Sequence, residues 1–154
     1  MRKLLVAISL VLLTAGSGAA ETAEEIVAWH KGYMQLWHDA NVDIDALAAH
    51  FAVPGYFVGA DGAQVATTKE MIRSRMVAAV ERLKQQKWTR SEVQVKASML
   101  NPAAALIEAE WTNSYTTEAT PPGGCRVRPF YYLAAKTKEG WKILSSQPGP
   151  CKVH

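Results

Sequence analysis

The side chains best suited to chemistry gather in the segment WHKGYMQLWH, from Trp29 to His38, which holds two histidines, two tryptophans and a tyrosine. His30, Tyr33 and Trp37 follow one another at steps of three and four residues, so an α-helix presents them on one face. On such a face His30 is a candidate general base, because an imidazole exchanges protons near neutral pH. The alternative is a hydrogen-bonded histidine at the edge of the core, which the usual environments of histidine favour. Tyr33, on the same face, is the other candidate for proton transfer if the chain is an enzyme.

The histidines of this segment are not expected to bind a metal ion. Eight residues separate His30 from His38, which places them about 12 Å apart along a helix and turned by about 80° from each other. One ion cannot bind both at that distance. The two cysteines lie far apart in the chain and only His154 is near one of them, which disfavours zinc. The sequence also lacks a glycine-rich phosphate loop and a serine nucleophile motif, so we expect neither a metal nor a cofactor.

A second group of pocket-type side chains lies on the stretch ALIEAEWTNSYTT, which alternates as a β-strand does. Trp111 and Asn113 share one side of it, and alternation in a later strand is expected to place Tyr131 on the same side. A polar amide among apolar neighbours needs a partner, so Asn113 bonds either a neighbouring strand or a ligand. His30 is expected to border the same cavity. The predicted ligand pocket is formed by Tyr33, Trp37, Asn113 and Tyr131.

The other side of these strands is expected to carry paired charges. These are Glu108, Glu110, Arg126 and Arg128. Phe130 and Tyr132 are expected on the same outer side. Aromatic side chains on such a face indicate a surface that another molecule covers, and a homodimer interface is predicted there.

The spacing of apolar residues predicts helices first and strands afterwards. Residues 22–40 have an apolar stripe of helical period, a second short helix covers residues 43–51, and a third begins with a capping box at Thr67. An Asp-Gly pair at residues 61–62 predicts a β-hairpin between the second and third helices. From residue 91 onward the period changes to two, which indicates long antiparallel strands. The fold class is therefore α+β, with the N-terminal helices packed in the concave face of a curved antiparallel sheet.

This order of elements resembles the nuclear transport factor 2-like superfamily, which includes the SnoaL-like polyketide cyclases and ketosteroid isomerase. The stretches that carry the resemblance are WHKGYMQLW, HFAVPGYFVGADGAQVATTKEMI and FYYLAAKTKEGWKILSSQ. The resemblance implies a cystatin-like, cone-shaped fold whose open end forms a pocket between sheet and helices, often in a dimer. It says little about activity, because one fold supports many functions.

The sequence departs from the isomerase pattern at the position of the catalytic base. The isomerase resemblance requires a carboxylate on the strand after the second helix, and AVPGYFVG has none. Asp61 is explained by the turn alone. We therefore interpret the chain as a domain that binds a small apolar ligand or a partner protein without catalysis. The alternatives are a SnoaL-like lyase, isomerase or cyclase that uses a pocket histidine or tyrosine, and an accessory dimer whose pocket its own side chains fill.

Residues 1–20 are typical of a signal peptide, with Arg2 and Lys3 before an apolar run and small residues at the end. The run is too short for a membrane anchor, so we expect residues 21–154 to form a single exported domain, periplasmic or secreted. The chain has 17 basic and 14 acidic side chains; without Arg2 and Lys3 the balance is 15 to 14. Such a balance predicts neither a nucleic-acid partner nor binding to an anionic membrane.

An even number of cysteines in an exported chain predicts a disulfide between Cys125 and Cys151. If the last hairpin turns at residues 138–140, facing residues have numbers that sum to about 276–278, and the two cysteines meet at one end of this range. Two free thiols are the alternative.

Overall fold

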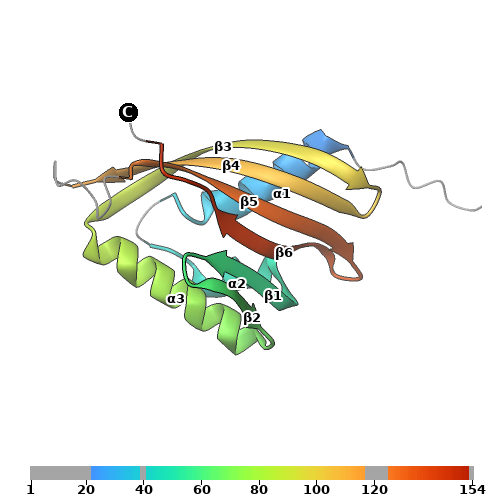
Figure 1. The fold of residues 1–154 in the computed structure, drawn as a ribbon, viewed down its shortest axis with the longest axis horizontal. Coiled ribbons are helices and arrows are strands. Elements are labelled where there is room, and N and C mark those ends of the chain that lie inside the picture. The colour runs from blue at the N-terminus through green and yellow to red at the C-terminus, as the bar shows by residue number, and fades with distance from the viewer. Residues whose placement is uncertain (1–21, 39–40, 117–124, 153–154) are drawn as a thin grey trace, which may run out of the picture.

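The computed structural model of the protein describes residues 22–38, 41–116 and 125–152. These residues form helices and one mixed sheet (Figure 1). The elements in chain order are α1 (Ala23–Gln35), α2 (Ile44–Ala49), β1 (Phe51–Gly59), β2 (Gly62–Ala66), α3 (Lys69–Gln85), β3 (Trp88–Asn101), β4 (Ala104–Tyr115), β5 (Val127–Thr137) and β6 (Gly140–Pro148). The predicted α+β class is confirmed.

The helix starts follow from side chains that cap the first backbone N–H groups. Thr22 and Glu25 form the predicted capping box: the Glu25 carboxylate accepts from the Thr22 N–H at 2.7 Å, and Thr22 Oγ1 accepts from the Glu25 N–H at 3.3 Å. The predicted cap of α3 at Thr67 is wrong by one residue, because Thr68 accepts the Met71 N–H. α1 ends at Gln35, earlier than predicted, and Trp37 follows it in a hydrogen-bonded turn.

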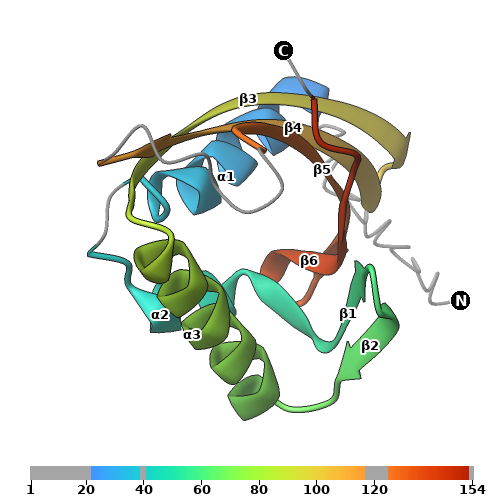
Figure 2. The same cartoon turned by 60° about the vertical axis from the view of Figure 1, so that its left-hand side comes forward.

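The sheet bends around the helices and has the order β2-β1-β6-β5-β4-β3. β3 to β6 are antiparallel neighbours, whereas β1 runs parallel to β6, a pairing that the strand patterns did not indicate. Figure 2 shows α1 beneath β3 and β4, with the sheet turning through β6 toward β1 and β2 and with α3 on the open side. The concave side of the sheet therefore faces the helices, as predicted.

The inward row of β4 is as predicted, but the faces of β5 are reversed. Trp111 pairs with Arg128 and Ile107 pairs with Tyr132, so Arg128 and Tyr132 point into the concave side. Tyr131 pairs with Glu108 on the outer side and is 36% exposed. The prediction that Tyr131 lines the pocket is therefore wrong. β5 has large apolar side chains on both faces, so alternation does not show which of its residues point inward. A shift of one residue exchanges the inward and outward faces of the whole strand.

The last hairpin has the predicted register and the predicted disulfide. Thr137 pairs with Gly140, and Tyr131 pairs with Gln147. Cys125 and Cys151 are bonded to each other, with Cα atoms 5.4 Å apart. The bond lies beyond the end of the β5–β6 ladder, next to an isolated bridge between Val127 and Lys152. It therefore ties the two ends of this hairpin together.

One predicted feature lies outside the described residues, and the prediction that Phe130 and Tyr132 lie on the outer face of the sheet is wrong. Residues 1–20, interpreted as a signal peptide, lie outside the described residues. The outer face of the sheet exposes Leu106 and Tyr131 but not the predicted Phe130 and Tyr132, which point inward. Within residues 22–152, leaving aside the two undescribed gaps, no helix has the length and apolar character needed to cross a membrane.

Candidate functional site

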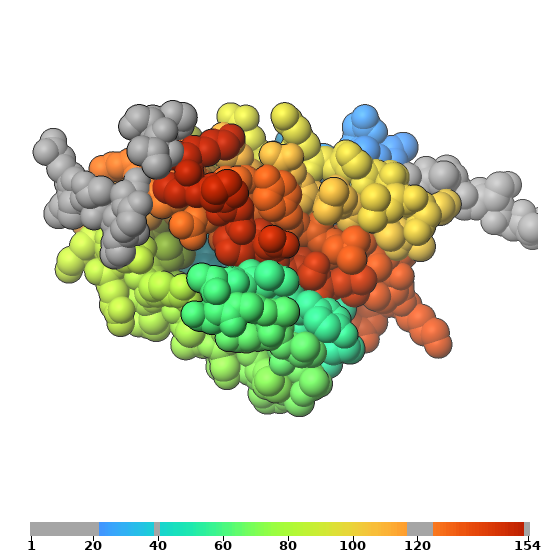
Figure 3. Space-filling model, viewed as in Figure 1, coloured from blue at the N-terminus to red at the C-terminus, as the bar shows by residue number. Residues whose placement is uncertain are grey.

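A cavity of about 370 Å³ opens between α3 and the concave face of the sheet. Its walls come from six parts of the fold: the end of α1, the C-terminal half of α3, and the inner faces of the four strands β3 to β6. The space-filling view shows the surface hollowed where α3 meets the orange and red strands β5 and β6 (Figure 3). Its volume is within the range of small-molecule sites in proteins.

Aromatic rings form the deep part of this cavity. Trp37 and Trp111 meet edge to face, with ring centroids 6.0 Å apart and planes at 90°. Phe130 and Tyr33 extend the surface from either side, with centroids 6.1 Å from Trp111 and 6.4 Å from Trp37. Trp37 and Trp111 are only 7% and 8% exposed, and neither indole nitrogen has a hydrogen-bond partner among the described residues. An apolar or aromatic ligand fits this surface.

Asn113 is held in place by a short chain of hydrogen bonds. The indole N–H of Trp88 donates to Ser91 Oγ at 2.9 Å, and the Ser91 hydroxyl donates to Asn113 Oδ1 at 2.6 Å. The structural partner considered for Asn113 is therefore present. Because its carbonyl oxygen is engaged, the amide nitrogen of Asn113 is left to donate into the cavity that this residue lines.

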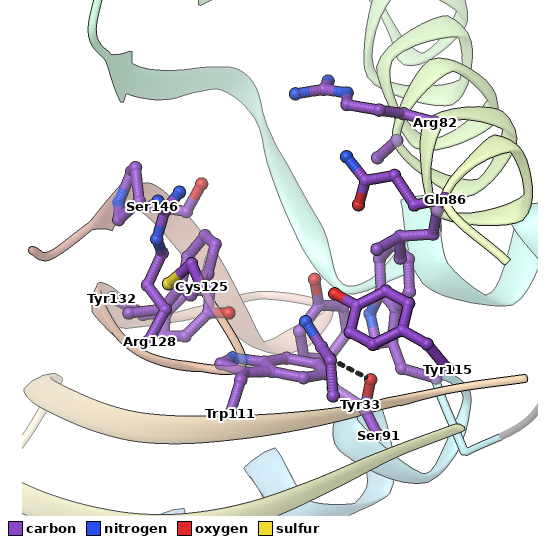
Figure 4. Close-up of a pocket in the computed structure, with 16 residues that line it drawn as sticks. Tyr33, Arg82, Gln86, Ser91, Trp111, Tyr115, Cys125, Arg128, Tyr132 and Ser146 are labelled. Carbon is purple, nitrogen blue, oxygen red and sulfur yellow. Dashed lines mark hydrogen bonds between the residues drawn. The ribbon is translucent and has the colours of Figure 1, made fainter. Parts of the chain in front are cut away.

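Two arginines stand on opposite sides of the cavity. Figure 4 shows Arg82 and Gln86 projecting from the end of α3 and Arg128 rising beside Ser146, with Trp111 below them. The Arg128 Nε atom is buried without a hydrogen-bond partner in the described part of the chain. The described residues that line the cavity include neither an aspartate nor a glutamate. The site is therefore rich in donors and positively charged.

The phenols at the inner end of the cavity stay protonated at neutral pH. Burial raises the pKa of Tyr33 well above its ordinary value, and the neighbouring Trp37 and Tyr132 side chains only partly oppose this shift. Burial also raises the pKa of Tyr132, and the nearby Tyr33 adds to the effect. Both residues therefore act as neutral hydrogen-bonding groups and are poor proton donors in an acid–base step.

His30 does not border the cavity, so this part of the prediction is wrong. Its side chain is fully buried behind the cavity wall, with ring centroids 5.3 Å from Tyr33 and 4.7 Å from Tyr132. Burial, together with repulsion from His50, lowers the pKa of His30 from 6.5 to about 3. Neither ring nitrogen has a hydrogen-bond partner among the residues described. A neutral imidazole without access to the cavity cannot serve as its general base.

The structure brings together Tyr33, Trp37 and Asn113, three members of the predicted pocket, and excludes Tyr131. Sequence reasoning missed Arg128 and Tyr132 because the phase of β5 was read wrongly. The residues at positions 128, 130 and 132 lie on one face of β5, so knowing that any one of them points inward would have identified the other two. Among the described residues no three metal-binding side chains come together.

A model of the NTF2-like protein family DUF6841 matches residues 23–151. The chain belongs to this NTF2-like family. A comparison with curated proteins finds no match. The architecture of the NTF2-like chain, a bent sheet around helices with a cavity at its open side, agrees with the predicted resemblance.

Several solved structures share this NTF2-like fold. A domain of unknown function with a cystatin-like fold from Nostoc punctiforme is 20% identical with a TM-score of 0.63, over 86% of this chain and 78% of that one. An NTF2-like protein of unknown function from Shewanella oneidensis is 17% identical with a TM-score of 0.60, over 82% and 98%. A protein with a ketosteroid isomerase-like fold from Catenulispora acidiphila, in complex with trimethylamine, is 22% identical with a TM-score of 0.53, over 85% and 88%. These likenesses show the fold.

Proposed function

We propose that this NTF2-like chain is an exported domain that binds a small, largely apolar ligand in its aromatic cavity and does not transform it. The observation that carries the proposal is the cavity of about 370 Å³, whose floor is aromatic and whose polar groups converge from several strands. This combination is typical of small-molecule sites. The trimethylamine complex of the Catenulispora acidiphila protein supports small-ligand binding in this fold.

The chemistry of the lining favours binding over catalysis. Proton transfer needs a titratable group with a pKa near the working pH and within reach of the substrate. The described lining residues include no histidine, aspartate or glutamate, and the pKa values of the tyrosines at 33 and 132 are raised away from neutrality. A lyase, isomerase or cyclase mechanism therefore finds no carboxylate or histidine base among them.

Export is part of this proposal and has separate support. The bond between Cys125 and Cys151 is of a kind that persists in oxidising compartments. The mature protein should begin near Glu21, which N-terminal mass analysis of the periplasmic and secreted fractions would establish. A chain that keeps residues 1–20 and stays in the cytoplasm would contradict export.

Narrowing the cavity tests the binding function. Ala79 of α3 lines the cavity, and Ala78, its neighbour on the same helix, is exposed. Native mass spectrometry of the purified protein should detect a retained small molecule, which Ala79→Phe should abolish and Ala78→Phe should preserve. If the protein carries no small molecule and also takes up neither charged nor uncharged aromatic probes, the proposal is wrong.

A further inference from the structure

We propose that the ligand of this cavity is an organic anion, with an aromatic or apolar body on the tryptophan floor and a carboxylate held by Arg128. The inference rests on the proposed binding function and narrows it to one ligand class. It follows from an excess of hydrogen-bond donors over acceptors among the polar lining groups that the structure describes. The two charged residues among them are both arginines.

Arg128 differs in its surroundings from arginines elsewhere on the molecule. Arg73 pairs with Asp45 at 2.7 Å, and Arg90 pairs with Glu92 at 3.0 Å, both on the outer surface. Arg128 has no ion pair among the described residues, although its Nε atom is buried. A buried N–H of a charged group without an acceptor destabilises the fold unless something supplies that acceptor.

The carboxylate nearest to Arg128 in the strand register forms an ion pair on the other side of the sheet. Glu110 pairs in register with Pro129, next to Arg128, but alternation points it to the outer side of the sheet. There it forms an ion pair with Lys152. Glu110 therefore neutralises Lys152 on the outer side of the sheet, whereas the Arg128 guanidinium faces the cavity on the inner side.

The positions of the two arginines define how an anion would lie. Arg128 rises beside Ser146 over Trp111, and Arg82 reaches toward the same space from α3 (Figure 4). A guanidinium binds a carboxylate with two parallel N–H bonds, which fixes its orientation. The body of the molecule then lies against Trp111 and Phe130, while Arg82, which is exposed, adds a charge at the entrance.

The same features disfavour a cationic ligand. Aromatic walls attract quaternary and protonated amines through cation–π contacts. In this cavity, however, an amine would lie near two other positive charges, because both charged lining residues that the structure describes are arginines. Repulsion in a partly enclosed cavity makes an amine a poor occupant.

Three probes of nearly equal shape test the sign of the charge: 1-naphthaleneacetate, its neutral amide 1-naphthaleneacetamide, and the cation 2-(1-naphthyl)ethylammonium. Isothermal titration calorimetry should show the acid binding to the purified protein at least about tenfold more tightly than the amide, the ratio expected for a charge-assisted hydrogen bond. The cation should bind weakest. Because these comparisons use the unaltered protein, they do not depend on whether a variant folds.

Variants then show which arginine binds the carboxylate of the probe. Arg128→Gln should bring the affinity for the acid down to that for the amide, and Arg82→Gln should have a smaller effect. Arg126→Gln is the matched control, because Arg126 is exposed, lies two residues away and does not line the cavity. Equal affinity for acid and amide, or a preference for the cation, would overturn the anion assignment and leave the binding function standing. Binding of none of the three would count against both.

Discussion

Replacing both Cys125 and Cys151 with alanine should lower the free energy of unfolding by about 3–4 kcal/mol. The two residues are 26 positions apart in the chain, and their bond closes the whole β5–β6 hairpin into a covalent loop. For a loop of about 27 residues the chain-entropy relation gives about 12 cal/mol/K, which is about 3.5 kcal/mol at 25 °C. The native sheet should survive the change, because hydrogen bonds from Lys152 to Val127 and from Gly149 to Pro129 hold the same strand ends.

Urea unfolding followed by circular dichroism measures this difference. Three samples are compared: the oxidised protein, the same protein in a phosphine reductant, and the double alanine variant. The reduced protein is the control, because it loses the bond without losing the sulfur atoms, and its stability should match that of the variant. A loss below about 1 kcal/mol, or free thiols in the unreduced and unfolded protein, would refute the loop-closure reasoning.

Two further predictions concern buried polar groups. Ser91→Ala should lower the free energy of unfolding by about 1–3 kcal/mol in urea titrations, because it leaves the Trp88 N–H and the Asn113 carbonyl without partners; an unchanged midpoint would contradict this. The pKa of His30 is lowered to about 3 in the folded protein, so His30 takes up a proton in the unfolded chain first as the pH falls. Its contribution to the unfolding free energy is therefore complete above about pH 6.5 and is lost as the pH falls toward 3. Between pH 7.5 and 4.5 the unfolding free energy should therefore fall by about 2–3 kcal/mol more in the wild type than in His30→Phe, and equal slopes would show that the buried histidine titrates normally.

The sequence was sufficient for features that depend on local chemistry. The capping box at Thr22, the hairpin at the Asp-Gly pair, whose turn lies one residue earlier than predicted at residues 60–61, and the register of the last hairpin each depend on residues close together in the chain. The disulfide followed from that register, because hairpin pairing brings Cys125 and Cys151 to the same end. The inward face of β4 was also readable, since apolar and polar residues alternate cleanly along it.

The phase of β5 against β4 could not be read in the same way. Phe130, Tyr131, Tyr132 and Leu133 put large apolar side chains on both faces of β5, so alternation carries no signal there. The pairing of β5 with β4 is decided by tertiary packing across a long connection. As a result the sequence placed Tyr131 in the pocket, whereas the structure puts Arg128 and Tyr132 there and changes the expected character of the ligand.

His30 shows a different limit of the sequence. Helical spacing correctly gave the face that it shares with Tyr33, but a face alone does not say how deep a residue lies. His30 lies behind Tyr33 and Tyr132, and these two rings separate it from the cavity.

The indole N–H signals of the five tryptophans test the central claim most directly, because each gives its own peak in a ¹H–¹⁵N spectrum. Trp37 and Trp111 line the cavity, whereas Trp29 and Trp141 pack against each other elsewhere, with ring centroids 6.4 Å apart. On titration with 1-naphthaleneacetate the peaks of Trp37 and Trp111 should shift together and saturate, while those of Trp29 and Trp141 stay in place. Shifts confined to Trp29 and Trp141, or no saturable shift at Trp37 and Trp111 with the acid, its amide or the naphthyl cation, would contradict ligand binding in this cavity.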